Sequence, residues 1–269
     1  MKCYIENILC DNEISTDIKE LIPDAMLRRR MSKVVKGAVS TAVECAGGIG
    51  ALKDYDAIIT ATGWGCLADS EKFLMNMIGN DEELLNPTPF IQSTFNTPGG
   101  QIALLNHNHC YNVTYVNRSH SFEDALLDAF LRIEDEESKR VLVGAFDEQI
   151  ESSRKILQHL HSYDKYHEGE GCAFLTLSSE KKENSLAEIV KIDFPKLPMS
   201  EADCREKYCS REESVLLYND LADIGVYPTA SAKVLAKAVK KIKEGAGEVV
   251  VFNSVWSTKR ASVVVIKCI

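Results

Sequence analysis

The sequence of 269 residues has no long uninterrupted hydrophobic run. Its longest apolar stretches, such as Val249–Phe252 and Ser262–Ile266, are the size of strands, whereas a membrane-spanning helix needs about 20 apolar residues. The first residues also lack the charged segment and apolar stretch of a secretory signal. We therefore expect no membrane span and a cytoplasmic location.

The nine cysteines include no Cys-x-x-Cys pair, so the closely spaced ligands of a zinc site are missing. His107 and His109, with Cys110 beside them, have no matching pair of carboxylates. We therefore expect no metal ion. The thiols are interpreted instead as small buried hydrophobic side chains in a reducing compartment, and this holds for Cys45, Cys172 and Cys268.

Basic residues are fewer than acidic ones, with 31 Lys and Arg against 40 Asp and Glu, and the formal net charge is −9. This balance argues against a general partner of nucleic acid or of anionic membranes, although local basic surfaces remain open. Hydrophobic residues make up 45% of the chain, which is ample for a core.

Strands rich in β-branched residues alternate with amphipathic helices along the chain. The order predicts an α/β fold with a mostly parallel sheet and helices on both faces. A polar segment at 178–185 separates a first half, 1–178, from a shortened copy, 186–269, within one domain. The expected strands are Cys3–Leu9, Ala57–Ala61, Val113–Val116, Val141–Ala145, Ala173–Leu177, Ala187–Phe194, Val249–Phe252 and Ser262–Ile266. The expected helices are Met26–Cys45, Asp69–Ile78, Pro98–Leu105, Ser119–Ile133, Glu213–Ile224 and Ser231–Lys243, and 195–211 is expected to be a surface loop.

The segment Tyr111–Leu127 predicts a short strand, a sharp polar turn and a helix that opens at Ser119. Such a turn is how many enzymes present a nucleophile, because the unpaired N–H groups and the helix dipole stabilise negative charge there. The residue at the tip is a serine, and no obvious base accompanies it.

Six short blocks, taken in order, resemble the β-ketoacyl synthases of the thiolase-like superfamily, and in particular their shortened members. The resemblance spans nearly the whole chain, although no single block is decisive. It implies a thiolase-like layered αβαβα fold with a truncated second half. The blocks are Leu27–Gly47, Thr62–Gly65 (TGWG), Pro89–Ala103, Leu142–Asp147, Glu168–Leu177 (EGEGCAFLTL) and Phe252–Ile266.

Matched residue by residue, the resemblance implies that the catalytic residues of the family are gone. The nucleophilic cysteine of the family falls on Ser119, counted back from Ala125–Leu126. The two catalytic histidines of the family follow its Gly-Glu-Gly strand, but the last histidine here is His167, which precedes that strand. A hydroxyl without a base is a poor nucleophile. We therefore expect no condensation activity and no cofactor.

Two other interpretations of Ser119 remain open. Ser119, His120 and Asp124 form a Ser-His-x-x-x-Asp pattern in which Asp124 would orient the imidazole, as in some acyltransferases. Adjacent residues point in different directions on a helix, however, so His120 is a weak candidate base for Ser119. The favoured interpretation is that Ser119 or Ser121 caps the helix.

The resemblance also implies a role for residues near the subunit interface. In ketosynthases the block at 89–103 lies at the dimer interface, where bulky side chains close the acyl pocket of the partner. Phe90, Thr94 and Phe95 are therefore predicted gate residues, and Trp256 is expected to obstruct the pocket mouth or to pack in a rearranged loop. A basic helix face is a candidate docking site for an acidic acyl carrier protein, and a solvated face is its commoner explanation; it contains Arg28, Arg29, Arg30 and Lys33.

These expectations combine into one functional hypothesis. The chain is predicted to be a non-catalytic, chain-length-factor-like subunit that pairs with an active β-ketoacyl synthase in fatty acid or polyketide-type biosynthesis, such as that of aryl polyenes. The alternatives are an acyltransferase or hydrolase that uses Ser119, and a homodimeric acyl-binding scaffold.

Overall fold

The computed structural model describes residues 1–255 and 259–269. Nine strands of this part of the chain form one mixed sheet, ordered β3-β2-β4-β5-β1-β6-β9-β8-β7. The strands are β1 (Cys3–Cys10), β2 (Ala57–Ala61), β3 (Tyr111–Tyr115), β4 (Arg140–Asp147), β5 (Gly171–Ser178), β6 (Ala187–Asp193), β7 (Val215–Tyr218), β8 (Glu248–Asn253) and β9 (Ser262–Lys267). The helices are α1 (Ile18–Leu21), α2 (Ala25–Arg30), α3 (Lys33–Cys45), α4 (Leu67–Gly79), α5 (Pro87–Gln92), α6 (Thr97–Leu105), α7 (Ser121–Glu134), α8 (Glu151–His159), α9 (Glu201–Tyr208) and α10 (Ser231–Lys243).

The expectation of a mostly parallel sheet is wrong. In the described part of the chain, the parallel pairs are β2 with β3, β2 with β4, and β7 with β8, and the other five pairs are antiparallel. The reason is that β5 returns beside β4 along its whole length, and β9 returns beside β8 in the same way. Such strands need no crossover helix, so the alternation of strands and helices in the sequence overstated the parallel part.

The second half repeats the strand pairing of the first. The sequence β2-β4-β5-β1 is linked by a parallel pair and then two antiparallel pairs, and β7-β8-β9-β6 shows the same succession. Within the described residues no strand of the second half corresponds to β3. The result is a thiolase-like layered α/β fold with a shortened second half.

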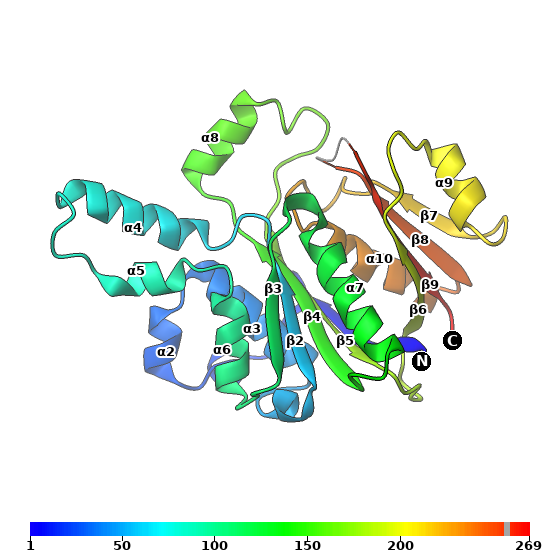
Figure 1. The fold of residues 1–269 in the computed structure, drawn as a ribbon, viewed down its shortest axis with the longest axis horizontal. Coiled ribbons are helices and arrows are strands. Elements are labelled where there is room, and N and C mark those ends of the chain that lie inside the picture. Colours follow the sequence, from blue (N-terminus) through cyan, green and yellow to red (C-terminus); the bar gives the residue numbers. More distant parts are fainter. Residues whose placement is uncertain (256–258) are drawn as a thin grey trace.

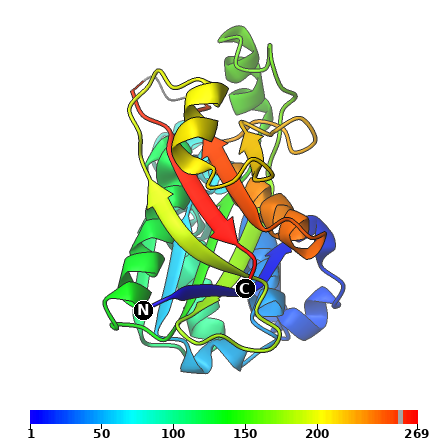
Figure 2. The same ribbon diagram turned by 90° about the vertical axis from the view of Figure 1, so that its right-hand side faces the viewer.

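Side chains of the strands alternate between two apolar layers, as the period of two requires. Ile59 and Val143 face the layer that contains α7 and α10, whereas Ile58, Leu142 and Phe174 face α3. Helices α7 and α10 share one core with strands of both halves, and α9 covers the outer face of the second half (Figure 1). Figure 2 shows β6, β8 and β9 crossing in front of the first half. The first turn of α7 is therefore enclosed by both halves.

Several boundaries differ from the expectations. The helix expected at 26–45 is two helices, because Met31 adopts an extended backbone between them and is buried. The segment expected as the helix Glu213–Ile224 contains β7 instead, and the loop expected at 195–211 contains α9. Of the three cysteines expected to be buried, Cys45 and Cys172 are, but Cys268 is exposed near the end of the chain.

Helices α4 and α5 project from the sheet beside its edge strand β3 (Figure 1). The ring of Phe90 on α5 packs on that of Phe73 on α4, with centroids 5.2 Å apart. Large apolar side chains nevertheless remain exposed on this pair of helices and the segments around it: Leu74, Met75, Ile78, Leu84, Phe90, Ile91 and Phe95.

Candidate functional site at the turn before α7

The turn between β3 and α7 is tighter than the sequence suggested. Residues Arg118–His120 form a 3-10 turn, and Arg118 has a φ of 51°, a conformation that non-glycine residues rarely adopt. Ser121 Oγ accepts a hydrogen bond from Asn117 N (2.8 Å) and donates one to Arg118 O (2.7 Å). Ser119, only 5% exposed, stands at the tip of this constrained turn. Strained backbone of this kind often accompanies functional sites.

The favoured helix-cap interpretation is wrong. Helix α7 begins at Ser121, and its N-cap is His120, whose side chain makes no capping hydrogen bond. The 3-10 turn moves Ser119 one position too far from the helix, and Ser121 is engaged with the turn itself. Ser119 therefore does not act as the N-cap of α7.

A buried carboxylate lies one turn beyond Ser119. Glu123 Oε1 accepts hydrogen bonds from Asn253 Nδ2 (3.0 Å) on β8 and from Ser262 Oγ (2.7 Å) on β9. Asn253 Nδ2 also lies 3.4 Å from Ser119 O, and no described residue forms a hydrogen bond with the buried second oxygen of Glu123, Oε2. The turn at Ser119 is therefore tied to the second half by a carboxylate, an amide and a hydroxyl. Sequence analysis missed Glu123, Asn253 and Ser262 as members of one cluster.

His120 and Asp124 do not form a dyad in the described contacts. The ring of His120 packs edge-on against Phe194, with centroids 6.0 Å apart. Asp124 Oδ2 accepts a hydrogen bond from Asn117 Nδ2 at 2.6 Å. The ring nitrogens of His167 lie 2.7 Å from Glu168 O and 3.1 Å from Ala222 O, so this imidazole holds backbone segments together. These contacts give no geometric support to a Ser-His-Asp arrangement.

Asp147, at the end of β4, holds the TGWG segment in place. Its Oδ1 accepts hydrogen bonds from Thr62 Oγ1 (2.8 Å), Gly63 N (3.0 Å) and Trp64 N (2.8 Å). Its Oδ2 accepts two more, from Thr229 N (3.1 Å) and Thr229 Oγ1 (2.7 Å). One carboxylate thereby joins the loop after β2 to the segment before α10. The sequence signal for it was a carboxylate ending an otherwise apolar strand.

The titration of Asp147 leads to a testable pH dependence. Burial raises its pKa from 3.8 to about 6, against the opposing effect of its hydrogen bonds. Because the folded-state pKa is the higher one, the linked stability is complete below pH 3.8 and is lost as pH rises through about 6. We expect the stability of the wild type, relative to Asp147→Asn, to fall by about 2–3 kcal/mol over this interval. Urea unfolding of both proteins across the interval measures the difference, and a constant difference would contradict this assignment.

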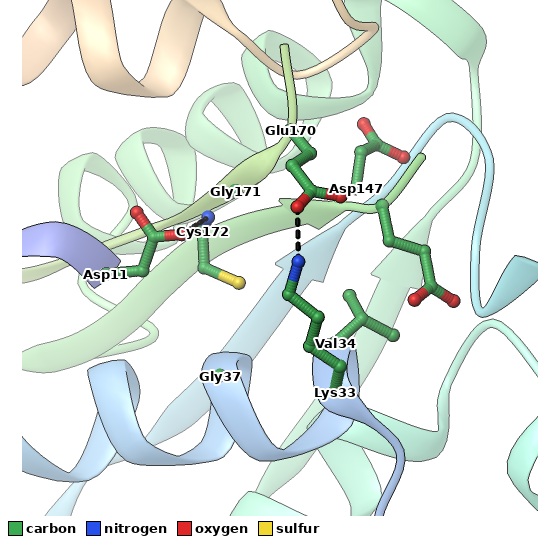
Figure 3. Close-up of a pocket in the computed structure, with 9 residues that line it drawn as sticks. Asp11, Lys33, Val34, Gly37, Asp147, Glu170, Gly171 and Cys172 are labelled. Carbon is green, nitrogen blue, oxygen red and sulfur yellow. Dashed lines mark hydrogen bonds and ion pairs between the residues drawn. The ribbon is translucent and has the colours of Figure 1, made fainter. Parts of the chain in front are cut away.

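A small cleft with charged side chains in its lining opens at the start of α3, next to Asp147 (Figure 3). Its volume is about 120 Å³, and its walls include Asp11, Glu170 and Cys172. Lys33 pairs with Glu170 across the cleft. Burial favours a higher pKa for Glu170, but the hydrogen bond from Lys33 and further favourable contacts outweigh it, and the pKa is lowered. Among the described residues, no cluster of His, Cys, Asp and Glu is suited to hold a metal ion.

The predicted carrier-docking residues are partly engaged within the chain. Lys33 pairs with Glu170, and Arg28 Nη1 donates to the carbonyl oxygens of Ile22 and Pro23. Arg29 and Arg30 are exposed. The basic surface available for a partner is therefore smaller than the sequence suggested.

The predicted gate residues lie together on α5 and the turn that follows it. Phe90 and Phe95 are 55% and 46% exposed. Thr94 Oγ1 forms a hydrogen bond with Thr97 Oγ1 (2.8 Å), which holds the turn. Trp256 lies outside the described residues.

The layered architecture and the strand-turn-helix at Ser119 define an α/β protein of the thiolase-like class. The family model for the N-terminal domain of β-ketoacyl synthases matches residues 7–188, more than half of the chain. The chain therefore belongs to the β-ketoacyl synthase family. A search of curated proteins gave no match.

Solved structures of ketosynthases share the fold. A β-ketoacyl synthase from Burkholderia phymatum is 12% identical with a TM-score of 0.74, and the match covers 100% of this chain and 99% of that chain. The ishigamide ketosynthase/chain length factor is 16% identical with a TM-score of 0.69, over 95% and 86% of the two chains. A ketosynthase in complex with its chain length factor from Xenorhabdus doucetiae is 15% identical with a TM-score of 0.58, over 98% and 99%. No helix in the described part of the chain is long and apolar enough to span a membrane.

Proposed function

We propose that this chain is a non-catalytic ketosynthase-like subunit that pairs with an active β-ketoacyl synthase, as a chain-length factor does. The observation that carries the proposal is the set of residues found at the turn before α7. Ser119 stands there, at the position where the resemblance puts the nucleophilic cysteine of the family, and Asn253 Nδ2 joins its backbone carbonyl (3.4 Å) to the carboxylate of Glu123 (3.0 Å). A serine hydroxyl is a far weaker nucleophile for transacylation than the thiolate that the family uses.

The surface beside β3 supports a protein partner. Among the described residues, strand β3 ends the sheet and pairs only with β2, so no described strand lies beside one row of its backbone groups. Helices α4 and α5, which carry exposed apolar residues, project on the side of the molecule where β3 lies (Figure 1), and exposed apolar surface commonly marks an interface. Among the similar structures are a ketosynthase with its chain length factor and a ketosynthase with its acyl-carrier protein. An active ketosynthase is thus the proposed partner, and its acyl carrier protein would deliver the growing chain.

The pathway class follows from the same proposal. A subunit without its own chemistry contributes shape, by closing the acyl pocket of the partner with Phe95 and its neighbours. Products of fatty acid or polyketide type, including aryl polyenes, fit such a pocket. The alternative in which Ser119 carries an acyl group is favoured only by the strained turn at Arg118.

Co-expression with the ketosynthase of the same gene cluster tests the pairing. We expect a heterodimer on size-exclusion chromatography, and we expect Ile78→Asp, on α4, to weaken it at least tenfold. The reason is that Ile78 is 70% exposed in the proposed interface. When the complex forms, a carboxylate at this position would lose its water without gaining an ion pair or a hydrogen bond. Ile156→Asp on α8, also at an exposed position, is the matched control and is expected to leave the complex intact. A homodimer, with no complex formed, would favour the scaffold alternative and contradict the proposal.

A further inference from the structure

The ring of Phe95 lies directly on Gly65. Gly65 is the last residue of the TGWG segment between β2 and α4, and its φ is +72°. A Cβ built on Gly65 would stand 2.4 Å from Cδ1 and 2.5 Å from Cε1 of Phe95. Real side chains do not approach this closely, so the observed position of the ring requires a glycine here.

The surface on which the ring rests is itself fixed. Gly65 N donates a hydrogen bond to Thr62 Oγ1 (2.8 Å), and that hydroxyl donates to buried Asp147 (2.8 Å). The neighbouring Trp64 N donates to the same carboxylate. The backbone at Gly65 is thus anchored to the end of β4, within the core of the fold.

The segment that carries Phe95 is held from its other side. Thr97 Oγ1 donates a hydrogen bond to Ile91 O (2.8 Å) and also bonds Thr94 Oγ1 (2.8 Å), which closes the turn between α5 and α6. Because hydrogen bonds hold the backbone at both Gly65 and Phe95, the direction of the Phe95 ring depends on its side-chain torsion angles. The contact with Gly65 determines which direction the ring takes.

We infer that Gly65 is a positioning residue for chain-length control: by having no side chain, it lets Phe95 lie back against the turn and sets how far the ring reaches toward the partner. This inference rests on the proposed function. It adds that the depth of the partner's pocket is determined by position 65 as well as by position 95.

Gly65→Ala tests the inference in the complex with the ketosynthase. The ring is nearly half exposed, so the added methyl is expected to displace it outward, toward the partner, and to shorten the products. Alanine at positive φ also strains the backbone, and Gly50→Ala is the matched control for that strain. Gly50 has a φ of +80° and no atom within 4 Å of its built Cβ. Gly50→Ala is therefore expected to leave product length unchanged.

A second measurement keeps contact and function apart. In the purified subunit, Gly65→Ala is expected to lower the melting temperature clearly more than Gly50→Ala does. Combined with Phe95→Ala, it is expected to lower the temperature only by the amount that strain alone causes, because the clash is gone. Equal lowering in both backgrounds would overturn the contact on which the inference depends.

The outcomes for the products are equally distinct. If Phe95→Ala lengthens the products but Gly65→Ala leaves them unchanged, the positioning role is wrong and the proposed function stands. If neither substitution changes the products, the gate itself is wrong and the positioning role falls with it. Shorter products with Gly65→Ala and unchanged products with Gly50→Ala support the inference.

Discussion

Phe95→Ala is expected to lengthen the products of the complex by at least one two-carbon unit. The ring is held against Gly65 yet nearly half exposed, so part of its apolar surface is available to the proposed partner. Each methylene that an apolar pocket accepts or refuses is worth about 1–3 kcal/mol. Removing the ring therefore makes room for an added unit and removes the penalty against it. Mass spectrometry of the products released from the reconstituted complex measures the change.

The same position provides its own control. Phe95→Trp adds bulk at the same place and is expected to shorten the products. Phe95→Leu keeps an apolar side chain of intermediate size and is expected to fall between the wild type and Phe95→Ala. Product lengths that do not follow side-chain size would rule out Phe95 as a gate.

Glu123→Ala is expected to cause the largest loss of stability, about 2–4 kcal/mol. The substitution leaves Asn253 Nδ2 and Ser262 Oγ without their buried acceptor, and unsatisfied buried donors carry the full cost of desolvation. It also leaves a cavity in the first turn of α7, where both halves of the fold meet. Urea unfolding measures the loss.

Glu123→Gln separates the hydrogen bonds from the charge. A glutamine keeps an acceptor for Asn253 and Ser262, and it removes a buried carboxylate whose Oε2 forms no hydrogen bond with the described residues. This variant is expected to stay within about 1 kcal/mol of the wild type or to exceed it. A loss in Glu123→Gln as large as that in Glu123→Ala would show that the carboxylate charge itself stabilises the fold.

Local pattern was enough to predict the elements whose own residues show a clear apolar or β-branched pattern. The helix α10 has the predicted bounds, because Leu235, Ala238, Val239 and Ile242 repeat at helical spacing and are all buried. The strand β2 was also predicted in full, as a short run rich in β-branched residues.

Elements without that pattern were missed. Helix α8 has few apolar residues and buries none of them, and its Ile156 is exposed, so it lacks the apolar content that marks a core helix. The strand β7 lies at the end of the sheet with three of four residues half-buried, and its sequence fitted a helix equally well. Only the pairing of Val215 to Tyr218 with β8 decides the matter, and that is a tertiary contact.

The site was predictable only in its local part. The position of Ser119 at a strand-turn-helix follows from residues that are neighbours in the sequence. The cluster around it joins Glu123 to Asn253 and Ser262, which are 130 and 139 residues away. The contact between Gly65 and Phe95 likewise depends on how α5 folds back onto the TGWG segment. The local pattern of one sequence does not show which residues that are distant in the sequence come into contact.

The most direct test of the central claim is a decarboxylation assay of the purified subunit with a malonyl thioester of an acyl carrier protein. The active ketosynthase, assayed in parallel, is the positive control. With Ser119 in place of a thiolate and Glu123 and Asn253 beside it, the subunit is expected to release no carbon dioxide above background and to carry no acyl group by intact mass. Steady turnover, or an acyl adduct that disappears in Ser119→Ala, would contradict a non-catalytic role.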